Sequence, residues 1–215
     1  MTNYFHSAVI QITQAVAAAS QRQQPVLLLL SGGSAAQLIP ELFSALEPYQ
    51  LQLTISLADE RYVAIGSEAS NWSAVDAVRN RLPDAQFWPI LRGENRSHTA
   101  AAFDGFLQDA IHGGSSIIGL MGIGADGHIA GIKPHSPACE SMSNAIGFRG
   151  DDFERITITG RFFEKITHVT VYAQGTQKAF IIDKLQQDIA PVEMPAQYVK
   201  QAANYKIVYN NEVAV

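Results

Sequence analysis

A histidine set among glycines is the residue best suited to catalysis in this sequence of 215 residues. His128 ends the run Gly122-Ile123-Gly124-Ala125-Asp126-Gly127-His128, in which a carboxylate stands two residues before the imidazole. Glycine neighbours leave the ring free to reach a ligand, and the carboxylate of Asp126 can fix the tautomer of the imidazole and raise its basicity. The pair therefore predicts a general base, although a loop histidine that only contacts solvent is the simpler interpretation.

Three other turns carry residues suited to an anionic ligand. Ser31-Gly32-Gly33-Ser34 precedes a helical pattern and can bind phosphate through free N–H groups, although a tight turn with Ser34 as helix N-cap explains the same residues. Asp59-Glu60-Arg61 offers a guanidinium for a phosphate or an oxyanion, or else a surface ion pair. Lys178 stands in the first turn of a helix, where the dipole favours anions, so it requires either exposure or a bound anion.

The elements that must position these residues alternate between strands and helices. Apolar runs predict strands at residues 26–30, 51–57, 116–120, 155–159, 169–173 and 205–209. Helical spacing predicts helices at 3–22, from 34 through 46, and at 71–82, 100–111, 176–185 and 196–202. This alternation favours an α/β fold with a mostly parallel sheet covered by helices on both faces. Such sheets bind ligands beyond the carboxyl ends of their strands, which is where these four turns would meet.

The glycine run has two further interpretations. Gly122-x-Gly124-x-x-Gly127 matches the dinucleotide-binding fingerprint, but Pro134 cuts short any helix that follows it, so a nucleotide-binding oxidoreductase is a distant alternative. His135 lies seven residues after His128, but no third residue has the spacing of a zinc ligand, and no metal is predicted.

Composition narrows the class of protein further. Hydrophobic residues make up 47% of the chain, which excludes a disordered protein, and the net charge of −5 argues against non-specific nucleic-acid binding. Cys139 is the only cysteine, so an intrachain disulfide and the cysteine-rich zinc motifs are excluded. The longest strictly apolar run, Val26–Leu30, is far shorter than the roughly 20 residues of a membrane helix. The first residues lack the features of a signal peptide, and we expect a cytoplasmic protein with no membrane partner.

The motifs, in this order, resemble the 6-phosphogluconolactonase family, which is related to glucosamine-6-phosphate deaminase/isomerase. The resemblance runs from Val26 to Lys178 and includes Arg155-Ile156-Thr157-Ile158-Thr159. It implies a single Rossmann-like α/β domain over residues 1–215, with no cofactor and no nucleic-acid partner. It also implies hydrolysis of the sugar phosphate 6-phospho-D-glucono-1,5-lactone in the oxidative pentose phosphate pathway, by a monomer or small homo-oligomer.

On this resemblance the catalytic residues are expected to be His128, as the base that activates water for attack on C1, and Asp126, which orients it. The residues expected to bind the substrate or its phosphate are Ser31, Gly32, Gly33, Ser34, Asp59, Arg61, Asn71, Gly124, Gly127, Arg161 and Lys178. For Asn71 the simpler role is the N-cap of the next helix. Arg155 and Lys133 are secondary candidates for positive charge.

The sequence departs from the family pattern next to these residues. Ala35-Ala36 stands where the family usually has Thr-Pro, Ala64 where it has Pro, and Arg161 where the lactonases have an apolar residue. The related deaminases have a Glu five residues after the His, where this chain has Lys133, and Asp-Glu-Tyr where it has Asp59-Glu60-Arg61. Both positions favour lactone hydrolysis over deamination. A sugar-phosphate-binding protein without catalytic activity is the other alternative.

Overall fold

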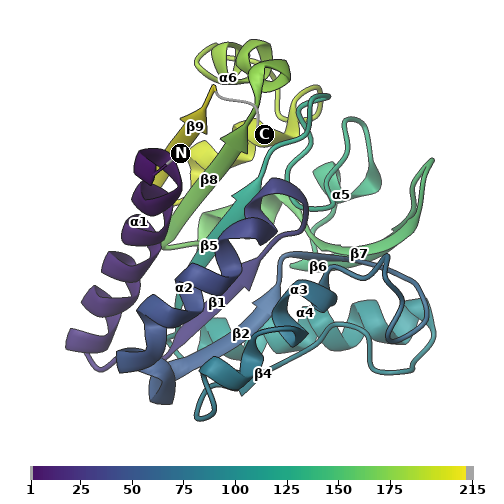
Figure 1. The fold of residues 1–215 in the computed structure, drawn as a ribbon. Coiled ribbons are helices and arrows are strands. Elements are labelled where there is room, and N and C mark those ends of the chain that lie inside the picture. Colours follow the sequence, from purple (N-terminus) through teal and green to yellow (C-terminus); the bar gives the residue numbers. More distant parts are fainter. Residues whose placement is uncertain (1, 212–215) are drawn as a thin grey trace.

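The computed structural model describes residues 2–211, and its centre is a six-stranded sheet in which all neighbouring strands are parallel. The strand order is β4-β2-β1-β5-β8-β9 (Figure 1). The strands are β1 (Val26–Leu30), β2 (Leu53–Leu57), β4 (Gln86–Phe87), β5 (Ser116–Gly122), β8 (His168–Gln174) and β9 (Tyr205–Asn210). All five side chains of β1 are buried, as in a strand covered on both faces. The predicted α/β fold with a mostly parallel sheet is confirmed.

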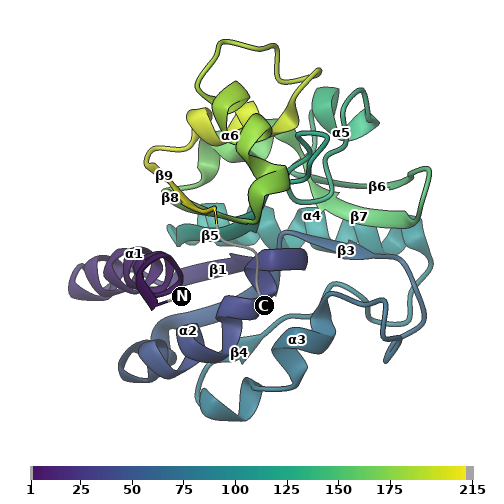
Figure 2. The same ribbon diagram turned by 45° about the horizontal axis from the view of Figure 1, so that its top comes forward.

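Helices cover this sheet on both sides. The α-helices are α1 (Thr2–Gln21), α2 (Ile39–Leu46), α3 (Trp72–Asp76), α4 (Arg96–His112), α5 (Pro137–Glu140) and α6 (Ala179–Leu185). In Figure 1, α1 and α2 lie in front of the sheet and α4 lies behind it, while Figure 2 shows α5 and α6 together at the opposite end of the molecule from α2. Val9, Ile12 and Val16 of α1 are buried, which is the helical spacing that predicted this element.

Several predicted helices consist partly or wholly of 3-10 turns. The stretch after Gly32 begins as the 3-10 helix η1 (Gly33–Leu38) and becomes α2 at Ile39. Pro40 follows in the first turn of α2, where its missing N–H is tolerated. The other 3-10 helices are η2 (Glu47–Gln52), η3 (Arg79–Arg81), η4 (Gly160–Lys165), η5 (Thr176–Lys178) and η6 (Pro195–Gln201). The prediction of one helix over 71–82 is therefore wrong, because α3 ends at Asp76 and only η3 follows it.

A second sheet, which the sequence did not predict, has three antiparallel strands. These are β3 (Asp59–Arg61), β7 (Glu154–Ile158) and β6 (Ala145–Arg149), in the order β3-β7-β6. The predicted strand at 155–159 exists as β7 but does not join the parallel sheet. Ala58 connects the two sheets, because its N–H donates to the Leu30 carbonyl at 2.8 Å and its carbonyl accepts from the Ile158 N–H at 2.9 Å. The chain leaves β2 at this point and brings Asp59 and Arg61 beside β7.

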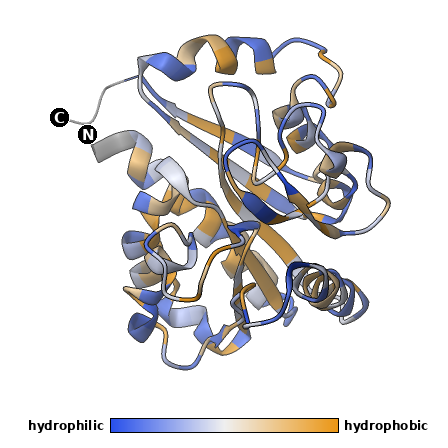
Figure 3. Cartoon of the chain, turned by 90° about the vertical axis from the view of Figure 1, so that its right-hand side faces the viewer, coloured by the Kyte–Doolittle hydropathy of each residue, from blue (hydrophilic) through white to orange (hydrophobic). Residues whose placement is uncertain are grey.

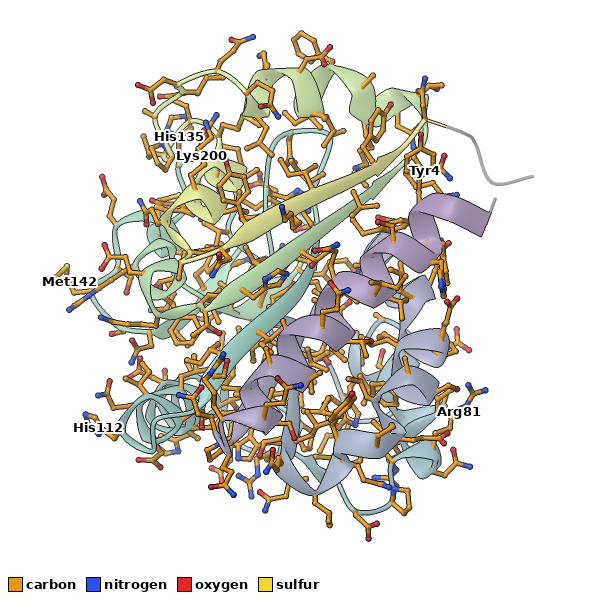
Figure 4. The ribbon with its side chains drawn as sticks, turned by 90° about the vertical axis from the view of Figure 1, so that its left-hand side faces the viewer. Tyr4, Arg81, His112, His135, Met142 and Lys200 are labelled. Carbon is orange, nitrogen blue, oxygen red and sulfur yellow. The ribbon has the colours of Figure 1, made fainter. Side chains whose placement is uncertain are left out.

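The core is built from the strands of the main sheet and the apolar faces of the helices. The hydropathy colouring in Figure 3 shows the central strands as hydrophobic and much of the surrounding loop and helix surface as hydrophilic. Figure 4 shows α1 lying across the main sheet with labelled side chains such as His112 and Arg81 at the periphery. Among the residues described, no helix has the length and apolar character needed to cross a membrane.

Candidate active site

The carboxyl ends of β1, β5 and β8 and the strand β3 surround one pocket of about 360 Å³. The predicted site residues that line it are Ser31, Gly32, Gly33, Ser34, Asp59, Arg61, Asn71, Gly124, His128 and Lys178, together with the secondary candidates Lys133 and Arg155. The pocket therefore lies where ligands were expected, beyond the carboxyl ends of the strands, because parallel strands bring these ends to one edge of the sheet.

His128 and Asp126 form a hydrogen-bonded pair at this pocket. Nδ1 of His128 lies 2.5 Å from Oδ1 of Asp126, and the backbone N–H of His128 donates to the same oxygen at 3.2 Å. The hydrogen bond from His128 holds the pKa of Asp126 well below its usual range, against the opposing effect of partial burial. Because an ionised carboxylate only accepts hydrogen bonds, Nδ1 carries the proton, and Nε2 of the neutral ring can accept another.

Gly124 and Gly127 shape the loop that holds this pair. A Cβ on Gly124 would overlap both the His128 ring and the Asp126 carboxylate, so the pair needs glycine at this position. Gly127 has a φ of +83°, and its N–H donates to the Gly124 carbonyl at 3.0 Å in the turn between the two catalytic candidates. Gly127 faces Met194 and does not line the pocket, so its contribution is to the loop conformation.

Asp59 is a buried carboxyl group on the wall of the pocket. Burial is the main cause that raises its pKa to about 6, with Glu60 adding to the rise and Arg155, His128 and Arg61 opposing it. Nδ2 of Asn71 donates to the backbone carbonyl of Asp59 at 3.1 Å and to Oδ2 at 3.4 Å. Asp59 is therefore a carboxyl group that exchanges its proton near neutral pH within the electrostatic reach of His128.

Asn71 does not act as the predicted helix cap. Its side chain makes no capping hydrogen bond to α3 and instead joins the pocket wall. The glycine at position 32 allows this approach, because a Cβ there would overlap the Asn71 carboxamide. Ser34 is likewise not an N-cap: it lies inside η1, and its hydroxyl donates to the Tyr172 carbonyl at 3.5 Å.

Glu60 takes over the capping role and is the structural member of the Asp-Glu-Arg motif. Its buried carboxylate accepts from the backbone N–H groups of Arg61 (2.8 Å), Asn71 (2.7 Å) and Trp72 (3.0 Å). It also accepts from the Ser70 hydroxyl at 2.7 Å. These bonds attach the start of α3 to β3, a role that the sequence pattern did not distinguish from those of its charged neighbours.

Besides Lys133, three cationic side chains converge on the pocket from different elements. Nη1 of Arg61 donates to the Ala69 carbonyl at 2.9 Å, and its guanidinium lies 5.1 Å from the centre of the Phe153 ring. Lys178 donates to the Ile123 carbonyl at 2.7 Å, and partial burial lowers its pKa. Arg155 is buried, and its Nε has no hydrogen-bond partner among the residues that the structure describes. The pocket thus concentrates positive charge suited to an anionic ligand.

Arg161 does not line the pocket, so the structure gives no support to its predicted role as a binding residue. It lies on η4, where its Nη1 donates to the Met142 carbonyl at 2.7 Å. Figure 4 shows the Met142 side chain projecting from the edge of the molecule. Arg155 and Arg161 both lie at or near the predicted strand at 155–159, and the sequence does not show which of them faces the pocket. Only the fold places Arg155 in the pocket and Arg161 outside it.

Three polar side chains of the pocket were missed: those of Asp152, Gln174 and Gln177. Gln174 ends β8, and Gln177 lies next to Lys178. Both would have been predicted if every polar residue at the carboxyl end of a strand had been considered. Asp152 belongs to the loop between β6 and β7, and nothing in its local sequence predicts its location.

Among the residues described, no group of three or more His, Cys, Asp or Glu side chains is arranged to hold a metal ion. His135 pairs with Glu193 at 3.1 Å at the edge of the molecule (Figure 4).

The parallel sheet with a polar pocket at the carboxyl ends of its strands defines an α/β protein that binds small ligands at this edge. The chain belongs to the family described as glucosamine-6-phosphate isomerases/6-phosphogluconolactonase, whose family model matches residues 2–208. The family predicted from the motifs is therefore confirmed.

Relatives from the lactonase branch are identical to the chain at about a quarter of the aligned positions. The 6-phosphogluconolactonase of Helicobacter pylori is 26% identical over 147 residues, which cover 66% of this chain and 63% of the relative. That of Chlamydia pneumoniae is 28% identical over 147 residues, covering 63% and 56%. The matched region is therefore less than two thirds of the length of either relative.

Solved structures from both branches share the fold. The 6-phosphogluconolactonase of Thermotoga maritima superposes with a TM-score of 0.84 at 18% identity, over 97% of this chain and 95% of the other. A monomeric glucosamine-6-phosphate deaminase superposes with a TM-score of 0.79 at 14% identity, over 98% and 95%. Because both branches superpose, the fold does not choose between their reactions, and that choice depends on the pocket residues.

Proposed function

We propose that this protein hydrolyses 6-phospho-D-glucono-1,5-lactone to 6-phospho-D-gluconate. The observation that carries the proposal is the His128–Asp126 pair. His128 lines a pocket rich in cationic side chains, and its Nε2 has no partner among the described residues. The names of the relatives from Helicobacter pylori and Chlamydia pneumoniae support the same reaction. We further propose that residues 1–215 act as a single domain in the cytoplasm, without a cofactor and as a monomer or small homo-oligomer.

The reaction is acyl transfer to water, and His128 acts in both of its halves. Nε2 takes a proton from the water that attacks C1 of the lactone, and the anionic Asp126 stabilises the imidazolium that forms. The same proton then passes to the ring oxygen as its bond to C1 breaks, which leaves a carboxylic acid that ionises in water. Asp126 keeps its own charge throughout, because its low pKa makes it a poor proton acceptor.

The cationic side chains divide into two roles in this scheme. Lys178 and Arg61, with the backbone N–H groups of Gly32-Gly33-Ser34, bind the phosphate, where fixed positive charge gives binding and orientation. Arg155, which also lines the pocket, stabilises the negative charge that develops on the carbonyl oxygen.

The deaminase alternative requires a carboxylate at the position of Lys133. This side chain lines the pocket, and its Nζ lies 3.3 Å from Oδ2 of Asp126, so a cation occupies the place where the deaminases use a Glu. We therefore propose the lactonase reaction, and release of ammonia from glucosamine 6-phosphate would contradict that choice.

The test is a lactonase assay on freshly made substrate, with the rate of spontaneous hydrolysis subtracted. His128→Asn removes the base, and we expect kcat/KM to fall by roughly 10²-fold or more. His135→Asn is the matched control, because His135 pairs with Glu193 outside the pocket and its loss leaves kcat/KM unchanged. An active wild-type protein whose His128→Asn variant keeps full activity would exclude this mechanism. Binding of 6-phosphogluconate by an inactive wild-type protein would instead indicate a non-catalytic binding protein.

A second assay tests the phosphate site. Lys178→Met is expected to raise KM by about tenfold or more, since a hydrogen bond to a charged group contributes about 1.5–3 kcal/mol. Lys184→Met is its control: it removes the same charge from α6, and Lys184 lies over the Phe180 ring and does not line the pocket. An unchanged KM in Lys178→Met would contradict the assignment of the phosphate to Lys178.

A further inference from the structure

Both oxygens of the Asp126 carboxylate have a hydrogen-bond donor, one an imidazole and the other a cation. Oδ1 bonds to Nδ1 of His128 at 2.5 Å, and Oδ2 bonds to Nζ of Lys133 at 3.3 Å. Nζ of Lys133 also lies 4.0 Å from Oδ2 of Asp152, whose other oxygen accepts from Arg155. A continuous series of contacts therefore links the imidazole to the buried arginine, and the charges along it alternate in sign from Asp126 onward.

Hydrogen bonds hold the backbone on both sides of Lys133, so the position from which its side chain extends is fixed. Ile129 and Ile132 are fully buried and exchange two backbone hydrogen bonds, of 2.9 and 3.3 Å, that close the turn before Lys133. After it, the Lys133 carbonyl accepts from the N–H of Ser136 at 3.0 Å and from the Cys139 thiol at 3.4 Å. The side chain is about two thirds buried, with an exposure of 31%, and it lines the pocket.

A cation on the far oxygen of Asp126 changes what the imidazole experiences. The attraction of Lys133 contributes to the low pKa of Asp126, after the larger effects of His128. The same positive charge opposes a second positive charge on His128, so it disfavours the imidazolium and favours the neutral ring. Asp59 from β3 acts in the opposite direction once it ionises. Lys178 from η5, which interacts with Asp126, and Arg155 from β7 and Arg61 from β3, which interact with Asp59, add positive charge to the same pocket, and Asp152 adds a carboxylate.

We propose that Lys133 is a positioning residue for the reaction: it fixes the second oxygen of Asp126, the carboxylate that holds the His128 ring, and its charge disfavours a second positive charge on that ring. This inference rests on the proposed function for its kinetic consequence. The related deaminases described above have a Glu at this position, so the inference concerns a feature in which this chain departs from that branch.

The experiment compares Lys133→Met, Lys133→Arg and the control Lys184→Met. In Lys133→Met the acid limb of the kcat/KM profile moves to higher pH, so that kcat/KM falls roughly three- to tenfold near pH 6 and much less near pH 8. Lys133→Arg keeps the charge and restores the wild-type profile, and Lys184→Met leaves it unchanged. A residue that only stabilised the fold would lower activity equally at both pH values.

A second readout does not depend on catalysis. The ring nitrogens of His128 are followed by NMR against pH in the same proteins, with His128→Asn used to assign the signals. Protonation of the ring is expected at higher pH in Lys133→Met than in wild type or Lys184→Met. If the wild-type protein hydrolyses no lactone but the ring signals move as described, the proposed function fails and the role of Lys133 stands. If the ring signals and the acid limb are the same in Lys133→Met and wild type, the role of Lys133 is wrong.

Discussion

Ionisation of the buried Asp59 carboxyl group at neutral pH should lower the free energy of unfolding, compared with the same protein in which this group is uncharged. Burial is the main cause that raises the pKa of Asp59 from 3.8 to about 6. At about 1.4 kcal/mol for each of the roughly two pH units between these values, the ionised form costs the native state about 3 kcal/mol relative to the unfolded chain. This is a large part of the stability of a typical domain, about 5–15 kcal/mol.

The sign of the pH dependence follows from which state holds the proton. Between about pH 4 and pH 6 the native protein retains a proton on Asp59 that the unfolded chain has released, so this group makes stability fall as pH rises through that window. Asp59→Asn cannot ionise, and its amide oxygen can accept the hydrogen bond that Asn71 now donates to Oδ2. The stability of the variant relative to wild type should therefore increase by up to about 3 kcal/mol from pH 4 to pH 7.

Urea unfolding followed by tryptophan fluorescence at several pH values measures this difference. The matched control is Asp76→Asn, because Asp76 is an exposed carboxylate on α3 that pairs with Arg79 on the surface. Any constant cost of the new amide group cancels when the two ends of the pH range are compared. If the stability difference between Asp59→Asn and wild type is the same at pH 4 and pH 7, the argument from burial is refuted. Lower activity in a more stable variant would be the usual exchange of stability for function at a catalytic site.

Three further substitutions test separate parts of the site. Gly124→Ala should lower kcat by about 10²-fold or more with little change in the far-ultraviolet circular dichroism spectrum, because its methyl group would displace the His128 ring. An active Gly124→Ala enzyme would show that the observed pair geometry is not required. Glu60→Ala should lower the free energy of unfolding by about 3 kcal/mol or more, since it leaves several donors without their buried acceptor; a thermal midpoint within a degree of wild type would contradict this. Arg161→Ala should leave kcat and KM unchanged in the lactonase assay, because its guanidinium bonds to the Met142 carbonyl outside the pocket, and a raised KM would show that it reaches the substrate.

Five of the six strands of the main sheet were predicted, because each is a local apolar run, whereas the two-residue strand β4 (Gln86–Phe87) was not predicted. β1 agrees with the predicted boundaries at both ends, since a continuous apolar run followed by Ser31-Gly32-Gly33-Ser34 has few other structures open to it. Knowing the carboxyl ends of four strands was then enough to gather His128, Arg61 and Lys178 at one edge, because parallel strands all point the same way.

The small sheet was not predictable in the same way. β3 consists of Asp59-Glu60-Arg61, three charged residues that local rules assign to a solvated loop, and it becomes a strand only because β7 pairs with it from almost 100 residues further along the chain. Its hydrogen-bond partners belong to another segment of the chain. Three residues are too few to show an alternation of polar and apolar side chains that would predict this pairing.

The sequence alone determined which residue types stand at the strand ends, and so the family and the region of the pocket. Only the tertiary structure decided their individual roles: Glu60 caps α3, Asn71 joins the pocket wall, and Arg155 reaches the pocket while Arg161 does not. The physical reason is that apolar periodicity records whether a residue is buried, which is a local property. The partner of a buried polar group is chosen by strand pairing and loop closure over tens of residues, and this exists only in the folded chain.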